Sequence, residues 1–484
     1  MKKTLLIFGI ICFAIRLHAQ SPLNWTSPLV VNSSAGTDWP RVALSHSTPV
    51  VAWGDFDSGK IFCRRGDAGN FGPEIQLTPD GLAATVFSLT GPDLKASGDT
   101  VYVIYVNQDA THSFLHRSFD AGVTFSDTLR IDNIGNNFLR YSSVDFMPGG
   151  NPVISFAKLD ENFSNPQYVV TKSLNGGSTF SNDLPVTATL GADPCDCCPG
   201  SIIYHEGVIA VIYRNAINDV RDMRAAISHD GGNTYELGII DNNNWIIESC
   251  PSSGGEGVII GDSLVSVFMN GVNGNKCFVS TLNINTLQPG FEKPLFNLPN
   301  GASQNHPAIV ASGDTIAVVW EQIIAGHRNI LFSYSLTGAS GLGVVVDTIS
   351  NVLPDGFHTN PDIAYSNGTF YVVFADGGAG QIYLMKGILY EISGVQNTVV
   401  VMPSIQVAGN QQGDAINIFS NQIVNEACSV SVYNMNGSIY LRQELNGLQH
   451  SQSLKADRAL TNGIYLVSIV AKDFSVSARM LIAH

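Results

Sequence analysis

The sequence predicts an all-β protein: a β-propeller, with seven blades favoured and six as the alternative, followed by a small C-terminal β-sandwich. A polar turn containing glycine occurs three times at intervals of 55 residues, as SFDAGVTF from Ser118, SLNGGSTF from Ser173 and SHDGGNTY from Ser228. Short apolar strands bounded by Gly, Asn and Asp surround each turn, as in antiparallel meanders. Only 13% of the residues are charged and 47 are glycine, which favours sheets and tight turns over solvated helices.

The chain begins with a predicted signal peptide, residues 1–19. Lys2 and Lys3 precede an apolar run, Leu5 to Ile15, that is too short to cross a bilayer, and cleavage is expected after Ala19. Cleavage would remove three basic residues and change the formal net charge from −15 to −18. This charge argues against nucleic acid as a partner. No later stretch is apolar for 18 residues, so no transmembrane segment is expected in the mature chain.

The propeller is predicted over residues 20–392. Four-stranded meanders recur about every fifty residues, a period typical of propeller blades. The last meander lacks a clear fourth strand, and the stretch WTSPLVVN at 25–32 resembles the outer strands elsewhere. The N-terminal strand is therefore expected to complete the last blade and close the ring. The seven meanders begin near Pro40, Pro92, Ser143, Pro199, Gly255, Pro307 and Pro361.

The repeated turn is predicted to have a structural role. Its Asp or Asn side chain can accept backbone N–H groups, its Gly can take a backbone angle closed to other residues, and its aromatic residue can pack between strands. With these turns the chain resembles the Asp-box (BNR-repeat) propellers of the sialidase-like superfamily over about residues 25–392, although Asn175 stands where the family has Asp. The resemblance implies the fold and gives almost no information about the activity. The predicted Asp-box residues are Asp120, Gly122, Thr124, Phe125, Asn175, Gly177, Thr179, Phe180, Asp230, Gly232, Thr234 and Tyr235.

The C-terminal part is predicted to be a linker, residues 393–411, and a β-sandwich, residues 412–484. Alternating strands flank Asn436-Gly437, which is a hairpin signal. The sandwich resembles the type IX secretion sorting domain through VYNMNG at 432–437 and LTNGIY at 460–465.

That resemblance has two departures. Ser420-Asn421-Gln422 stands where Pro-Asn-Pro is usual, and the end, Ala483-His484, is not a basic pair. The resemblance implies the type IX secretion machinery as a partner and passage across the outer membrane. The protein is then expected to be extracellular or attached to the cell surface. An ordinary accessory sandwich is the alternative.

The face opposite the repeated turns is the predicted working surface. The starts of the first strands and the ends of the second strands meet there and can converge on the axis. These positions hold Arg41, the cysteines at 195–198, Cys250, His306 and His358, and Asp55, Arg214, Glu321 and Asp376.

Five residues are candidates for ligand binding, because arginine can hold a carboxylate through two parallel hydrogen bonds. The alternative is that the arginines bridge neighbouring blades through Asp222 or Asp241. The candidates are Arg41, Arg214, Arg221, Asp222 and Trp245.

The most unusual segment is ADPCDCCPG at 192–200. Cys198 and Cys250 open adjacent blades, so a disulfide between their two segments is expected. Zinc or copper binding by Cys195, Cys197, Cys198 and Cys250 is the alternative, with a redox role as a third. The mature chain has seven cysteines, so at least one is not in an internal disulfide. No cofactor or metal is predicted.

Three functions remain open, and binding of a glycan or protein ligand without cleavage is favoured. The first alternative is a sialidase-type glycoside hydrolase acting on acidic glycans. For it the resemblance implies three axial arginines, an Asp acid/base and a Tyr–Glu pair. Arg41, Arg214 and Arg221 could form the arginine triad, but the sequence does not identify the catalytic groups. The second alternative is a metal-binding or redox protein that uses the cysteines.

Overall fold

A computed structural model describes residues 23–389 and 405–482, apart from gaps at 34–36, 68, 88–89, 298, 300, 355, 411–413, 421–422, 425–426, 435–437, 457–458 and 472–474. The predicted signal peptide, most of the predicted linker, Asn436-Gly437 and Ala483-His484 lie outside the described residues. The chain divides into two compact units, Met1–Glu391 and Ile392–His484.

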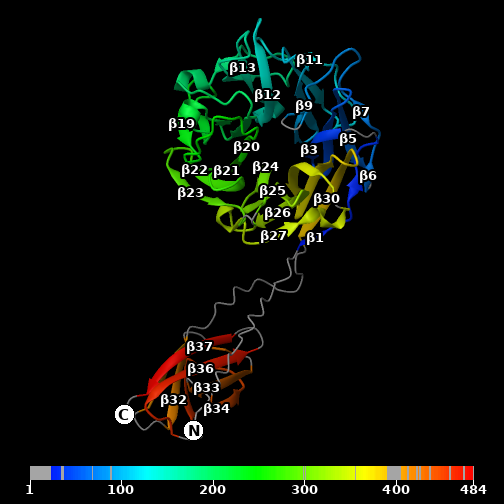
Figure 1. Ribbon diagram of the computed structural model, residues 1–484. Helices are drawn as coiled ribbons and strands as arrows, with labels where there is room; N and C mark the ends of the chain where they lie inside the picture. The colour runs from blue at the N-terminus through cyan, green and yellow to red at the C-terminus, as the bar shows by residue number, and fades with distance from the viewer. Residues whose placement is uncertain are drawn as a thin grey trace, which may run out of the picture. The chain divides into compact units, whose positions relative to one another are not determined.

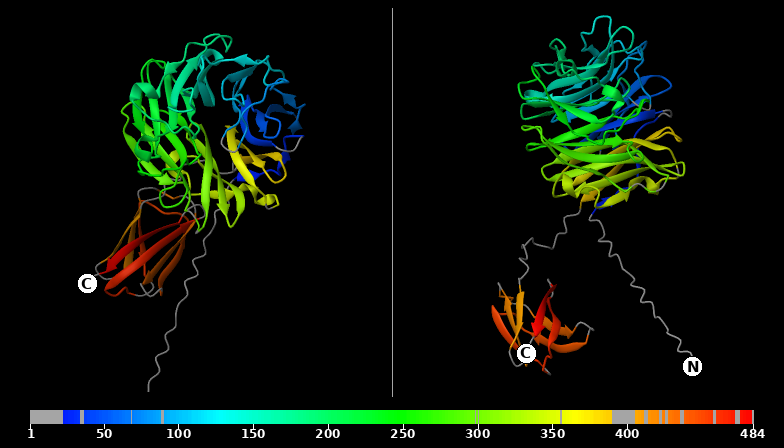
Figure 2. Two further views of the ribbon diagram at one scale, coloured as in Figure 1. Left: turned by 45° about the horizontal axis from the view of Figure 1, so that its top comes forward. Right: turned by 60° about the vertical axis from the view of Figure 1, so that its left-hand side comes forward.

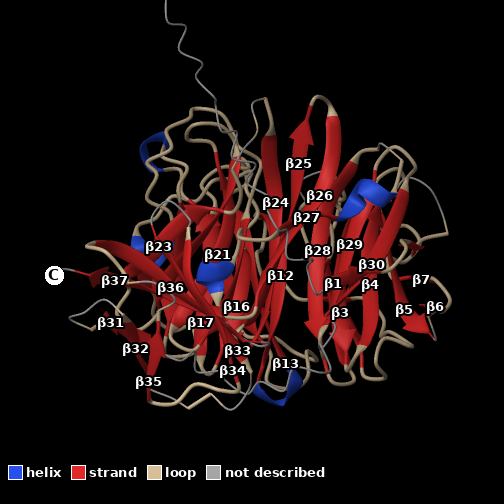
Figure 3. Cartoon of the chain, turned by 90° about the horizontal axis from the view of Figure 1, so that it is seen from below, coloured by secondary structure: helices blue, strands red, loops and turns tan. Residues whose placement is uncertain are grey.

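The first unit is a ring of seven antiparallel sheets (Figure 1), so among the described residues the favoured prediction of seven blades is confirmed. Within each blade the strands follow one another in sequence, and the first strands of neighbouring blades contact one another around the axis. The strands run between the two faces of the ring (Figures 2 and 3).

The strands of blades one to three are β3 (Thr37–Ser45), β4 (Thr48–Asp55), β5 (Lys60–Asp67), β6 (Asn70–Phe71) and β7 (Ile75–Gln76); β8 (Asp93–Ser97), β9 (Thr100–Val106), β10 (Ser113–Ser118) and β11 (Leu129–Arg130); β12 (Phe138–Met147), β13 (Asn151–Leu159), β14 (Gln167–Lys172) and β15 (Leu184–Pro185). Those of blades four to six are β16 (Ser201–His205), β17 (Val208–Arg214), β18 (Met223–Ser228) and β19 (Glu236–Ile239); β20 (Gly255–Ile260), β21 (Ser263–Asn270), β22 (Lys276–Asn283) and β23 (Pro289–Pro294); β24 (Ser303–Ser312), β25 (Thr315–Ile324), β26 (His327–Ser335) and β27 (Val346–Thr348). Short 3₁₀ turns lie between strands: η1 (Pro148–Gly150), η2 (Thr187–Leu190), η3 (Ile217–Asp219), η4 (Ala339–Gly341) and η5 (Ile349–Val352).

Blade seven closes the ring with strands from both ends of the unit. It consists of β28 (His358–Ser366), β29 (Thr369–Asp376) and β30 (Gln381–Leu389), and β1 (Leu23–Trp25) and β2 (Leu29–Val30) pair with β30. Beyond β2, the Asn32 side chain accepts the N–H of Ile382 at 2.7 Å and donates to the carbonyl of Gly380 at 3.0 Å. The predicted closure by the N-terminal strand is therefore confirmed.

The second strand of each blade is buried on both faces, because the sheets of the adjoining blades cover it. In β9 the six residues Val101 to Val106 are all buried, and in β17 all seven residues are. Such strands appear in the sequence as continuous apolar runs rather than as alternating patterns. Burial of these runs between neighbouring sheets supplies the main favourable term in the stability of the ring.

The repeated turns make the hydrogen bonds that their motif predicts. Asp120 Oδ1 accepts the N–H of Thr124 at 2.9 Å and the hydroxyl of Ser118 at 2.7 Å, and Gly122 has φ +83°. Asp230 makes the corresponding bonds to Thr234 and Ser228 at 2.9 Å each. Asn175 Oδ1 accepts Thr179 N–H at 2.9 Å, so the amide forms the same turn. The aromatic residues of the three turns pack against cores between blades: Phe125, Phe180 and Tyr235.

We expect Asp120→Ala to lower the free energy of unfolding by about 1 kcal/mol, because the N–H of Thr124 loses its acceptor. Asp120→Asn should lower it by less, since Asn175 already makes this turn. Urea unfolding of the two variants measures the difference. Desolvation acts to raise the pKa of Asp120, but the bonds from Thr124 and Ser118 lower it to about 2. The stabilisation by the ionised carboxylate should therefore be lost as the pH falls through that value. Equal losses for Ala and Asn would contradict the assigned role.

The second unit is a β-sandwich of two sheets, as predicted. One sheet has the order β31 (Ile405–Gly409), β32 (Ala415–Ser420), β35 (Ser451–Lys455), and the other the order β34 (Ile439–Leu445), β33 (Cys428–Asn434), β36 (Gly463–Ala471), β37 (Ser475–Ile482). Alternate residues of the central strands fill its core, among them Ile416, Ile418, Val430, Val432, Val467 and Ile469. In the described part of the chain, no helix is long and apolar enough to cross a membrane.

Candidate functional site

Four first strands carry a β-bulge at the same height on one face of the ring. In each, one residue has a left-handed backbone angle, φ +54° at Trp39, +57° at Tyr141, +48° at His306 and +50° at Asn360, and the pairing with the second strand shifts there. Residues with a side chain rarely adopt this angle, and such outliers cluster at functional sites. All four residues line one cavity at the mouth of the axis. The ends of the second strands lie on the same face, and the Asp-box turns lie on the opposite face.

The same position in the other three blades is held by a small residue or by proline. Counted back from the turn that ends each first strand, the equivalents of Trp39 are Gly91, Pro199 and Gly254. A Cβ at Gly91 would lie 2.6 Å from the Trp39 ring, and one at Gly254 would lie 2.4 Å from the carbonyl oxygen of Pro199. Gly91 therefore leaves room for the side chain of Trp39, and Gly254 lets the backbone at Pro199 approach closely. We call the seven residues at this position the mouth layer: Trp39, Gly91, Tyr141, Pro199, Gly254, His306 and Asn360.

Two residues further along each first strand lies a second ring of residues, all at the same distance from the turn that ends the strand. We call it the middle layer: Arg41, Asp93, Ser143, Ser201, Glu256, Ala308 and Asp362. Below the mouth, the first strands of all seven blades surround an axial cavity of about 340 Å³. The mouth and the axial cavity share Arg41, Asp93 and Glu256.

Three axial aspartates connect the first strands of neighbouring blades. Asp362 Oδ2 accepts the N–H of Val42 at 2.8 Å, and Asp93 Oδ2 accepts that of Val144 at 2.9 Å. Asp145, one layer deeper, accepts the N–H of Tyr204 at 2.7 Å. These carboxylates therefore hold neighbouring blades together and also add negative charge near the axis.

Glu256 is the middle-layer acid best placed to change its protonation near neutral pH. Burial raises the pKa of its carboxyl group to about 7, with Asp362 and Asp93 acting in the same direction and Arg41 and Lys95 opposing them. Burial also raises the pKa of Asp362. The walls of the two cavities hold three carboxyl groups, Asp93, Glu256 and Asp362, against the cations Arg41 and Lys95 and the imidazole of His306 at the mouth. The charge that a carboxylate ligand meets at the axis therefore depends on how many of these acids are ionised.

Of the five predicted ligand-binding residues, Arg41 lies at the axis. Its guanidinium carbon is 4.8 Å from the centre of the Trp39 ring, and Nη1 donates to the carbonyl of Pro40 at 3.1 Å. The other four, Arg214, Arg221, Asp222 and Trp245, lie together between blades four and five. The structure therefore does not bring Arg41, Arg214 and Arg221 together as an axial triad.

Arg214 is a buried connection between blades four and five, 1% exposed. Its guanidinium donates to the carbonyls of Ser253 at 2.9 Å, Arg221 at 2.5 Å and Met269 at 2.8 Å. Its own carbonyl accepts the N–H of Cys195 at 2.8 Å. These contacts favour the bridging role that the sequence left open over direct ligand binding.

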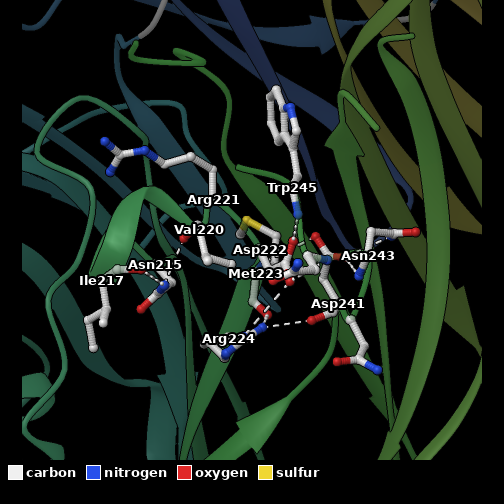
Figure 4. Close-up of polar contacts among 12 residues, drawn as sticks. Asn215, Ile217, Val220, Arg221, Asp222, Met223, Arg224, Asp241, Asn243 and Trp245 are labelled. Carbon is white, nitrogen blue, oxygen red and sulfur yellow. Dashed lines mark hydrogen bonds and ion pairs between the residues drawn. The ribbon is translucent and has the colours of Figure 1, made fainter. Parts of the chain in front are cut away.

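Asp222 and Trp245 belong to the same junction (Figure 4). Asp222 accepts the N–H groups of Asn244 and Trp245, each at 2.9 Å, and shapes the loop before Trp245. Burial raises the pKa of Asp222, and Asp241 adds to the shift. The Trp245 ring faces Arg214 at 5.5 Å inside the junction and lines neither the mouth nor the axial cavity. Arg221, whose side chain is 12% exposed, pairs with Asp219 at 3.4 Å.

The cysteine segment lies beside this junction. The disulfide joins Cys197 to Cys250 and links the segments that open blades four and five, as expected. Cys195 and Cys198 are free and buried, with their sulfurs 3.0 Å apart. Desolvation acts to raise the pKa of Cys198, but the hydrogen bond from Cys195 and the charge of Arg214 lower it to about 7. The four sulfurs lie within 4.8 Å of one another.

Two further pairs of side chains lie among the residues that were predicted on the working surface. Glu321, at the second strand of blade six, accepts Arg328 Nη1 at 2.8 Å and lies 3.5 Å from Nδ1 of His306. Glu321 is therefore placed to hold the His306 ring at the mouth. His358 and Asp376 approach at 3.8 Å, whereas Asp55 accepts Ser58 within its own turn.

Comparison with known proteins recognises the C-terminal unit. Residues 410–483 match the family described as the secretion system C-terminal sorting domain. The C-terminal unit is a sorting domain. It marks the chain for export by the type IX secretion machinery to the cell surface or the extracellular space, as predicted. No curated protein matches the chain.

Several solved structures are similar to this chain, each at low sequence identity. A Dyadobacter fermentans protein of unknown function is 12% identical, with 65% of this chain and 98% of that one covered and a TM-score of 0.46. A Hadza microbial sialidase is 11% identical over 72% and 65% of the two chains, with a TM-score of 0.43. The sialidase of Trypanosoma rangeli is 8% identical over 94% and 88%, with a TM-score of 0.44.

Proposed function

We propose that the exported propeller binds a glycan at the mouth of its axis without cleaving it. The observation that carries the proposal is the mouth layer, where Trp39, Tyr141 and His306 occupy left-handed bulges around one cavity. Backbone strain of this kind is retained where the position of a side chain matters. Aromatic faces pack against the apolar faces of sugars, and the arginine and carboxyl groups below can bind hydroxyl groups.

The charges favour a neutral glycan over an acidic one. When they are ionised, the carboxyl groups of Asp93, Glu256 and Asp362 outnumber the positive charges of Arg41 and Lys95. Arg214 and Arg221, which a sialidase-type site would need beside Arg41, contact the protein's own backbone instead. These features support binding over hydrolysis of acidic glycans.

A glycan array followed by calorimetry with the best neutral oligosaccharide tests the proposal. We expect Trp39→Ala to weaken binding by about 10- to 100-fold, because Trp39 has the largest apolar side chain among the residues that line the mouth. Phe119→Ala is the control, since Phe119 is an exposed aromatic residue of an Asp-box turn on the opposite face. Hydrolysis of a fluorogenic sialoside, or equal binding by both variants, would overturn the proposal.

A further inference from the structure

The four clustered cysteines form a chain of sulfur atoms that runs from the interior to the surface. Cys195 Sγ lies 3.0 Å from Cys198 Sγ and 3.4 Å from Cys197 Sγ, and Cys197 is bonded to Cys250. Cys195 and Cys198 are 3% and 1% exposed, whereas Cys250 is exposed. Cys195 therefore lies between a buried thiol and a disulfide that solvent can reach.

The surrounding backbone holds this arrangement in place. Cys195 N–H donates to the carbonyl of Arg214, and the carbonyl of Cys198 accepts the hydroxyl of Tyr168 at 3.2 Å. The guanidinium of Arg214, fixed by three carbonyls, places a permanent positive charge near Cys198. A cation beside a thiol favours the thiolate, which is the reactive form in disulfide exchange.

We propose that the cluster is an internal thiol–disulfide exchange site, in which one disulfide passes between the exposed pair Cys197–Cys250 and the buried pair Cys195–Cys198. In the first step Cys195 gives its proton to the Cys198 thiolate and attacks Cys197 Sγ. The Cys195–Cys197 bond forms, the Cys197–Cys250 bond breaks, and Cys250 leaves as a thiolate that takes a proton from water.

In the second step Cys198 loses a proton to solvent and attacks Cys195 Sγ. The Cys195–Cys198 bond forms, the Cys195–Cys197 bond breaks, and Cys197 leaves as a thiolate that is protonated. One disulfide and two thiols are present before and after, so no oxidant or reductant is consumed. Exchange with the surroundings would occur at Cys250, with a small extracellular thiol or disulfide.

A pH jump tests the proposal on the exported protein. The protein is first oxidised and then treated with a limiting amount of a phosphine at about pH 4, where exchange is slow because thiolate is scarce. The phosphine should reduce the exposed disulfide first and leave Cys195–Cys198 intact. After transfer to about pH 8 without added thiol, alkylation and peptide mapping should show the Cys197–Cys250 peptide rising at least about tenfold. The rate should not depend on protein concentration.

Two variants make the result specific. Cys195→Ser removes the sulfur that links the two pairs, so the Cys197–Cys250 peptide should not appear after the jump. Cys63→Ala, at a buried cysteine of blade one that is free in the structure, should leave the rate unchanged. An unchanged disulfide map after the jump, a rate proportional to protein concentration, or a stoichiometric zinc or copper ion in the purified protein would overturn the proposal.

Discussion

Arg214→Ala is expected to lower the free energy of unfolding by about 3–5 kcal/mol. The substitution leaves the carbonyls of Ser253, Arg221 and Met269 without their donor in a buried place and removes a large side chain that is 1% exposed. Guanidinium chloride unfolding followed by tryptophan fluorescence measures the change. Because Trp245 packs against Arg214 at 5.5 Å, its emission should shift before global unfolding.

Arg221→Ala is the matched control from the same junction. Its guanidinium makes long contacts, 3.3 Å to the carbonyl of Ile247 and 3.4 Å to Asp219, so we expect a loss of about 1 kcal/mol or less. If Arg214→Ala unfolded like the wild type but lost glycan binding, Arg214 would be a ligand-binding residue and the bridging role would be wrong.

The ring could be predicted because its signals are local and repeated. The repeated turn occurs in three consecutive blades, the buried second strand recurs in every blade, and the incomplete last meander indicates how the ring closes. Such features give a periodic pattern in the sequence, because each blade packs between two similar neighbours and needs the same types of residue at the same positions. The fold therefore followed from the sequence down to the pairing of β1 and β2 with β30.

The site could be predicted from the sequence only in part. A sequence pattern gives the position of an arginine along a strand, but it does not give the direction in which the side chain points. Arg41 and Arg214 both end on the predicted face, yet the first lines the axis and the second points into the junction of two blades. The sequence predicted a disulfide between the two cysteine segments, but it did not indicate which of the neighbouring cysteines at 195–198 pairs with Cys250.

The middle layer could have been found from the sequence. In four of the seven blades, a charged residue stands four positions before the last residue of the first strand: Arg41, Asp93, Glu256 and Asp362. Aligning the blades by the turn that ends each first strand, rather than by the Asp boxes, brings these charged residues into one register. Charged residues are scarce in this chain, so their recurrence at a single height indicates the axis.

Glu256→Gln is expected to make the protein more stable by about 2–3 kcal/mol at pH 8 and to have little effect at pH 4. The pKa of Glu256 is about 7 in the folded protein, above its ordinary value of 4.5, because burial disfavours the charge. Between these two values the folded state binds more protons than the unfolded state, so the stability of the wild type falls as the pH rises and stays low above the folded pKa. The glutamine amide carries no charge at any of these pH values, so the stability of the variant does not fall through the titration of residue 256.

Urea unfolding at a series of pH values, with the wild type and the variant compared at each, isolates this one carboxyl group from the other axial acids. Glu236→Gln, on the exposed outer strand β19, is the control and should leave the curve of the wild type unchanged. Glycan affinity measured over the same range should change between pH 6 and 8 in the wild type and remain flat in Glu256→Gln, if the Glu256 carboxyl group contacts the ligand. A parallel pH dependence of stability in the two proteins would show that folding does not raise the pKa of Glu256 and that the axis is more hydrated than its walls indicate.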